Sequence, residues 1–173
     1  MTRHTRAALI LSILVAAFSA NNAAASNSPR QIAFFHGKEI PLSRVAQHHC
    51  HNALGSTILC FDSQAERDAS LRRTIDAQRE MSPASDLSVN YVTFFADINF
   101  GGASFTTADP ISDLGSIGWN DRISSFKSLN SGHPKWWKDI SYSGPAWQWV
   151  AGSWVANVGS DANDQFSSVQ NVP

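Results

Sequence analysis

The chain has 173 residues, with 13 basic and 14 acidic side chains and a net charge of −1. This near-neutral balance gives no indication of nucleic acid or an anionic membrane surface as a partner. The length allows one ordinary domain, or a small domain with an appendage.

The first 25 residues have the three-part form of a secretory signal. Arg3 and Arg6 precede an apolar run over residues 7–18, and small residues follow up to Ala25. That run is about 12 residues long, shorter than the roughly 20 of a membrane span, which favours a cleaved signal over a membrane anchor. Cleavage after Ala25 would leave 11 basic and 14 acidic residues, a net charge of −3. We therefore expect a secreted protein without stable membrane insertion.

Cys50 and Cys60 are the two cysteines of the chain. An isolated pair in a secreted protein usually forms a disulfide. Histidines at positions 48, 49 and 51 make a metal site the alternative, but adjacent residues such as Cys50 and His51 rarely bind one ion. The sequence therefore favours an intrachain disulfide.

Residues 26–81 read as a small α+β module. A hairpin is expected over residues 32–42, with its turn at His36-Gly37, followed by a short helix over 42–50 and a strand over 57–61. Ser63 and Glu66 form a capping-box pattern at the start of a helix over 62–81. Pro, Ser and Asp then cluster in residues 82–88, which predicts a linker.

Residues 89–173 read as an all-β domain. Short strand-like runs such as YVTFF, ASFTT, WWKDI and FSSVQ alternate with turn signals, and no long helical pattern occurs. The sequence lacks the G-x-S-x-G, H-E-x-x-H and Gly-rich phosphate-loop patterns. We therefore expect a protein that is not an enzyme.

Two signatures occur twice within this β region. The pattern N-D-x-x-S-S stands at residues 120–125 and again at 163–168. An aromatic-x4-aromatic-x-Gly pattern precedes each copy; its residues are Phe95, Phe100 and Gly102, then Trp137, Tyr142 and Gly144. A head-to-tail repeat of about 42 residues indicates a duplicated supersecondary unit, and each copy has room for a four-stranded Greek key. Two such units can pack sheet on sheet around one core.

These repeated signatures resemble the βγ-crystallin superfamily, and most closely its microbial, calcium-binding members. The resemblance implies a mainly β fold, with two Greek-key motifs over about 91–130 and 133–170 packed as a β-sandwich. The small α+β module would precede this sandwich. Because both halves of the Greek-key pair lie inside residues 89–173, we expect this domain to fold without the module.

The resemblance further implies two calcium sites built from crossing loops. Side chains at the second and fifth motif positions and the carbonyl of the third would bind, completed by one hairpin carbonyl for each site. The implied ligands are Asp121, Arg122, Ser124 and Ile98, and Asp164, Gln165, Ser167 and Ile140. Arg122 departs from this chemistry, because it places a cation beside a cation site. We expect its long side chain to carry the charge into solvent and the site to be weakened, not abolished.

Other functions stay open at this point. The N-D-x-x-S-S motifs can be structural turns alone, because Asn, Asp and Ser favour turns. The superfamily also includes a protease inhibitor and toxin-like proteins, so an extracellular protein partner is an alternative. Five of the six tryptophans fall in the second copy and offer a glycan-binding platform if they are exposed.

Overall fold

The computed structural model describes residues 30–53, 56–81, 90–129 and 132–172. The predicted signal sequence and linker lie outside these residues. The elements in chain order are β1 (Ile32–Phe35), β2 (Lys38–Ile40), η1 (Leu42–Gln47), β3 (His49–Asn52), β4 (Thr57–Phe61), α1 (Gln64–Met81), β5 (Val92–Asp97), η2 (Ile98–Phe100), β6 (Gly101–Thr107), η3 (Leu114–Ile117), β7 (Ser125–Ser128), β8 (His133–Asp139), β9 (Ser143–Gln148), β10 (Trp154–Val155) and β11 (Ser168–Val172).

The N-terminal part, which comprises the described residues 30–53 and 56–81, begins with the predicted hairpin of β1 and β2. His36 and Gly37 both adopt positive φ, 50° and 73°, which the tight turn between two antiparallel strands requires. Helix α1 starts at the predicted cap, where the Glu66 amide donates to the Ser63 hydroxyl at 3.2 Å. Local sequence chemistry therefore accounts for both elements.

The predicted helix over residues 42–50 is wrong in its last part. Residues 42–47 form the 3-10 helix η1, but His49 begins strand β3. This strand pairs with β4 on one side and β6 on the other, and Cys50 forms the predicted disulfide with Cys60. Pairing on both edges holds these residues extended, so tertiary contacts override the local helical pattern.

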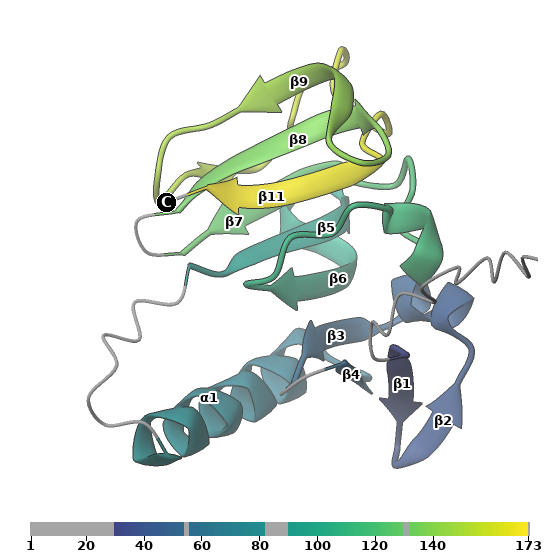
Figure 1. Cartoon of the computed structure of the whole chain (residues 1–173), viewed down its shortest axis with the longest axis vertical. Coiled ribbons are helices and arrows are strands. Elements are labelled where there is room, and N and C mark those ends of the chain that lie inside the picture. The colour runs from purple at the N-terminus through teal and green to yellow at the C-terminus, as the bar shows by residue number, and fades with distance from the viewer. Residues whose placement is uncertain (1–29, 54–55, 82–89, 130–131, 173) are drawn as a thin grey trace, which may run out of the picture.

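Two sheets carry the duplicated region. One has the strand order β10-β7-β5-β6-β3-β4-β1-β2, and the other has the order β11-β8-β9. Figure 1 shows the smaller sheet lying over β5, β6 and β7. The two copies also exchange strands: β10 of the second copy pairs with β7 of the first, and Ile111 of the first bridges to Val169 of β11. This arrangement confirms the predicted pair of Greek keys packed as a sandwich.

Large aromatic side chains fill the space between these sheets. The ring of Phe94 meets those of Trp119 and Trp136 edge-on, at 4.9 and 5.6 Å between centroids. Trp136 in turn stacks on Phe166 at 5.1 Å. All four side chains are fully buried, as is Ile123. These four aromatic residues, which lie outside the aromatic-x4-aromatic-x-Gly pattern, therefore build one core shared by both copies, because each buries a large apolar surface.

The N-terminal part is continuous with the larger sheet. Strand β3 pairs in parallel with β6, with His49 opposite Ser104 and His51 opposite Thr106. Helix α1 lies against β3 and β4 at the far end from the small sheet (Figure 1). No helix in the described ranges is both long and apolar enough to cross a membrane.

Candidate metal site

The first hairpin, residues 97–102, joins β5 to β6 through left-handed backbone. Asn99 and Phe100 have φ values of 57° and 62°, and Gly102 follows with 68°. The Ser125 hydroxyl spans this hairpin: it accepts from the Phe100 amide at 3.0 Å and donates to the Asp97 carbonyl at 2.6 Å. Ser125 is the sixth residue of the first N-D-x-x-S-S motif and acts here as a structural tie.

The second hairpin, residues 139–144, repeats this geometry. Ser141 and Tyr142 have φ values of 56° and 58°, followed by Gly144 at 74°. The Ser168 hydroxyl accepts from the Tyr142 amide at 3.1 Å and donates to the Asp139 carbonyl at 2.7 Å. The sixth motif residue therefore has the same role in both copies, which the sequence analysis did not assign to it.

The motif carboxylates lie on exposed, left-handed backbone. Asp121 and Asp164 have φ values of 52° and 54°. Each carboxylate accepts a hydrogen bond from the amide of the Asn before it, at 2.6 Å from Asn120 and 2.8 Å from Asn163. One carboxylate in each copy is thus held in the same orientation, with most of its lone pairs open to a further partner.

The two loops that carry the motifs, residues 113–124 and 156–167, cross one another. The Asp121 amide donates to the Phe166 carbonyl at 3.1 Å, and the Asp164 amide donates to the Ile123 carbonyl at 3.4 Å. These reciprocal bonds place each Asp beside the Ser of the other copy, since Ser167 follows Phe166 and Ser124 follows Ile123. The structure therefore brings the second and fifth motif positions of opposite copies together.

Ser124 and Ser167 differ from the serines that follow them. Both are buried, yet within the described residues neither hydroxyl makes a side-chain hydrogen bond. Neither oxygen is among the fully buried, unpartnered side-chain polar atoms of the described residues, so each hydroxyl keeps some access to solvent. At the fifth motif position, both hydroxyls are thus without a protein partner among the described residues.

The predicted hairpin carbonyls lie at the hairpin tips. Ile98 and Ile140 are 49% and 54% exposed. The Ile98 carbonyl accepts from the Gly101 amide, and the Ile140 carbonyl accepts from the Ser143 hydroxyl at 2.7 Å. One lone pair of each carbonyl remains, so both can still bind a cation.

The third motif position is used differently in the two copies. The Arg122 guanidinium donates to the Ala46 carbonyl of η1 at 3.2 Å, whereas the Gln165 amide donates to the Asp164 carbonyl at 3.0 Å. The expectation that Arg122 carries its charge into solvent is therefore incomplete. Its side chain is exposed but anchored on the N-terminal part.

The donor set as a whole fits calcium. It consists of carboxylate, hydroxyl and carbonyl oxygens, the ligands that this hard cation prefers. No group of three or more His, Cys, Asp or Glu side chains within the described residues could hold a metal ion. The alternative site around Cys50 does not form there either, because Cys50 is in the disulfide and His51 bonds to Ser70. The predicted calcium ligands do not form such a cluster, because they are distributed over two loops and two hairpins.

Three solved structures are similar to the β region. A double mutant of a βγ-crystallin domain from Clostridium beijerinckii is 33% identical over 46% of this chain and 93% of that domain, with a TM-score of 0.41. A βγ-crystallin from Ciona intestinalis is 31% identical over 47% and 98%, with a TM-score of 0.43. This identity extends over nearly the whole of each domain. The chain belongs to the βγ-crystallin superfamily.

An archaeal βγ-crystallin adds a third relative, 28% identical over 49% of this chain and 99% of its own, with a TM-score of 0.44. No family model and no curated protein matched the sequence. The similarity to these three structures covers about half the length of this βγ-crystallin chain.

The tryptophans of this βγ-crystallin domain do not form an exposed stripe. All six lie within the described residues, and of these only Trp154 is exposed, at 64%. Trp147 and Trp149 are half-buried and pack edge-on against Phe166, at 5.4 and 6.3 Å. The glycan-binding alternative therefore has a single exposed indole to rest on.

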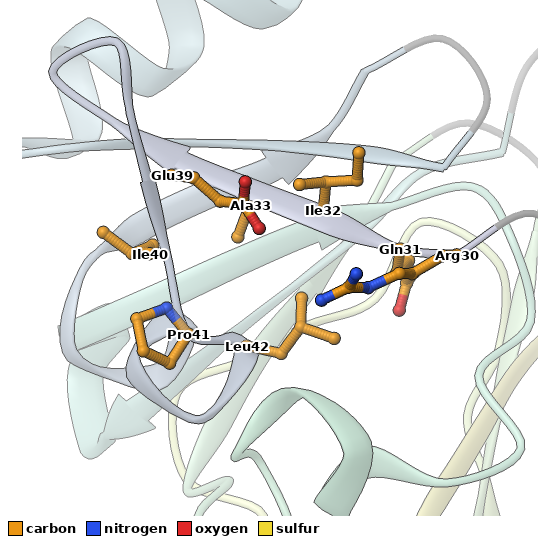
Figure 2. A pocket seen from close by; sticks show the side chains of 8 residues that line it. All are labelled: Arg30, Gln31, Ile32, Ala33, Glu39, Ile40, Pro41 and Leu42. Atoms are coloured by element: carbon orange, nitrogen blue, oxygen red, sulfur yellow. The ribbon is translucent and has the colours of Figure 1, made fainter.

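A surface pocket lies away from the motif loops. Its volume is about 440 Å³, and residues 30–33 and 39–42 line it, from the β1–β2 hairpin to the start of η1. Figure 2 shows the side chains that line it, among which Arg30 and Glu39 are charged and Gln31 is polar. None of the predicted calcium ligands lines this pocket, so it is a feature of the N-terminal part alone.

Proposed function

We propose that this protein is a secreted, non-enzymatic βγ-crystallin whose Greek-key domain binds two calcium ions and is stabilised by them. The observation that carries the proposal is the reciprocal pairing of Asp121 with Phe166 and of Asp164 with Ile123. These backbone bonds join each Asp to the residue that precedes the fifth-position serine of the other copy, which supports a site shared between the two loops. The disulfide supports an oxidising, extracellular location.

The chain's own residues would do three things at these sites. Asp121 and Asp164 would supply the negative charge, Ser124 and Ser167 a hydroxyl each, and the hairpins a carbonyl each. Calcium, when bound, would neutralise the carboxylates and cross-link loops from different copies. One full carboxylate for each ion supports a modest affinity, with Kd on the order of 10⁻⁵ to 10⁻³ M, as in extracellular modules.

Calorimetric titration of the mature protein with calcium tests the proposal. We expect two bound ions and a higher Tm in calcium than in chelator. At a free calcium concentration about 100 times Kd, each site adds about 2.7 kcal/mol to the free energy of unfolding. Identical melting curves in millimolar calcium and in chelator would leave both motifs as structural turns. Incubation with a panel of metalloproteases tests the inhibitor alternative in the same preparation.

A further inference from the structure

The N-terminal part touches only the first Greek key through hydrogen bonds. Within the described ranges, every hydrogen bond from residues 30–81 to the β region ends on residues 100–122 of the first copy. None reaches the second hairpin or the loop over 156–167. The donor–acceptor pairs are Ser104 to His48, His49 with Ser104, Asn52 to Thr107 and Asp109, Gln64 to Phe100, Arg67 to Ser104, and Arg122 to Ala46. The two copies are therefore supported unequally.

Two of these contacts hold segments that carry proposed calcium ligands. The Gln64 side chain on α1 donates to the Phe100 carbonyl at 2.9 Å, two residues from Ile98 in the first hairpin. The Arg122 side chain donates to the Ala46 carbonyl at 3.2 Å, next to Asp121 in the first loop. The N-terminal part thus grips the first hairpin and the first loop at the same time.

Close backbone packing supports the second of these contacts. Gly118, in the first loop, has a φ of +76°, and a Cβ there would lie 2.7 Å from the Ser43 carbonyl oxygen of η1. Gly159, in the second loop, also has a positive φ of +87°, but a Cβ there would meet nothing within 4 Å. Of these two glycines, Gly118 therefore packs closely against the N-terminal part, whereas Gly159 has open space around it.

We propose that the N-terminal part is an intramolecular clamp that pre-organises the calcium ligands of the first Greek key, with Arg122 as its positioning residue. The inference rests on the calcium binding proposed above. A loop that is already held in place loses less conformational freedom when it binds an ion. By thermodynamic linkage, calcium must then strengthen the docking of the clamp by the same factor.

The clamp and simple electrostatics predict opposite changes in calcium affinity when the Arg122 side chain is removed. A cation that only lies near a calcium site repels the ion, so its removal raises calcium affinity. A positioning residue instead raises affinity through the loop that it holds, so its removal lowers affinity. Arg122→Gln separates the two, because it gives the first copy the residue that the second copy has at Gln165 and keeps the backbone carbonyl.

Calorimetric titration of the full mature chain is the first test. We expect Arg122→Gln to lower the average calcium affinity about fivefold, Arg122→Lys to recover part of the loss, and the control Arg72→Gln, which removes the same charge from an exposed position on α1, to change affinity less than twofold. Equal or tighter binding by Arg122→Gln overturns the clamp. An absence of binding by the wild type would instead overturn the calcium proposal, and the clamp with it.

Hydrogen exchange at the Ser104 amide provides a readout of docking itself, because this amide donates to the His48 carbonyl across the junction at 3.1 Å. Saturating calcium should slow its exchange in the wild type and not in Arg122→Gln. Without calcium, exchange should be faster in Arg122→Gln than in the wild type. An unchanged Ser104 rate in both comparisons contradicts the clamp even if calcium binds.

Gly118→Ala and Gly159→Ala form a matched pair. Both place a Cβ on left-handed backbone, but only the first displaces η1. Gly118→Ala should lower calcium affinity and speed Ser104 exchange more than Gly159→Ala does. Equal effects of the two changes would overturn the inference.

Discussion

Adjacent serines in each repeated motif have different surroundings. Ser125 and Ser168 are fully buried, and each makes two hydrogen bonds to a hairpin backbone. Ser124 and Ser167 are also buried but make no side-chain hydrogen bond within the described ranges. The sixth motif position is therefore structural, whereas the fifth is the one that we propose as an ion ligand.

Alanine substitution should separate these two roles. Ser125→Ala or Ser168→Ala should lower the free energy of unfolding by about 1–3 kcal/mol with or without calcium, because each leaves buried hairpin groups unpaired. Ser124→Ala or Ser167→Ala should leave the calcium-free protein nearly unchanged and reduce the gain in calcium. Urea unfolding in calcium and in chelator measures both. The opposite pattern would reverse the assignment of the two positions.

Asp121 and Asp164 should determine the calcium-dependent part of stability. Replacing either with Ala should remove most of the gain in Tm on calcium addition, and should weaken both sites because the loops cross. Their φ values of 52° and 54° add a cost of about 1 kcal/mol for Ala, which Asn avoids. Asp121→Asn and Asp164→Asn are therefore the controls for backbone strain. A full calcium response in both Ala variants would exclude these carboxylates as ligands.

At the scale of elements, the contact between β3 and α1 contains a buried histidine. The Nδ1–H of His51 donates to the Asn52 carbonyl at 2.8 Å, and its Nε2 accepts from the Ser70 hydroxyl at 3.0 Å, an assignment that satisfies both ring nitrogens. Desolvation by burial, aided by the positive charge of Arg67, lowers the pKa of His51 below its ordinary value of 6.5. The folded protein therefore holds this ring neutral.

This lowered pKa predicts a loss of stability in mild acid. Below pH 6.5 the unfolded chain binds a proton at this ring that the folded protein resists, so the free energy of unfolding falls as pH drops toward the folded pKa. His48 and His49, whose pKa values burial also lowers, act in the same direction. Urea unfolding at about pH 7.5 and pH 5.5 should show a smaller loss in His51→Gln than in the wild type. Equal losses would assign the acid sensitivity to other groups.

At the scale of the whole molecule, the N-terminal part closes the edge of the first Greek key. Strand β3 pairs along β6. Arg67 of α1 is buried, with 3% of its surface exposed, and its guanidinium donates a hydrogen bond to the Ser104 hydroxyl at 2.7 Å. Ala33, Val45 and Ile58 belong to the same contiguous core as the aromatic residues between the sheets. An uncovered sheet edge is a template for association, so this pairing protects the β domain.

The isolated β region tests that view. A fragment of residues 89–173 should fold, because both Greek keys and the aromatic core between the sheets lie inside it. It should unfold at a lower urea concentration than the full mature chain, and it should self-associate through the exposed edge of β6. Circular dichroism and analytical ultracentrifugation, with the full chain as control, measure these outcomes. A disordered fragment in saturating calcium would show that the N-terminal part is required for folding.

The sequence alone determined the features that depend on short-range chemistry. The cap at Ser63, the turn at Gly37 and the repeated aromatic-x4-aromatic-x-Gly and N-D-x-x-S-S patterns all concern residues within a few positions of one another. Positive φ and side-chain capping are local properties, so their signatures are legible in one chain. The register of the repeats also sufficed to predict two Greek keys sharing a core.

Only the tertiary structure decided how these pieces meet. The predicted helix over 42–50 includes the first two residues of β3, because their extended form comes from partners in β4 and β6, of which β6 is more than 50 residues away. The different roles of Ser124 and Ser125 depend on which hairpin backbone lies above them. Arg122 donates to the Ala46 carbonyl, 76 positions earlier in the chain, and the local spacing of residues cannot predict such a contact. Such contacts are set by the packing of distant segments, where loop closure and core burial, not local preference, determine the lowest free energy.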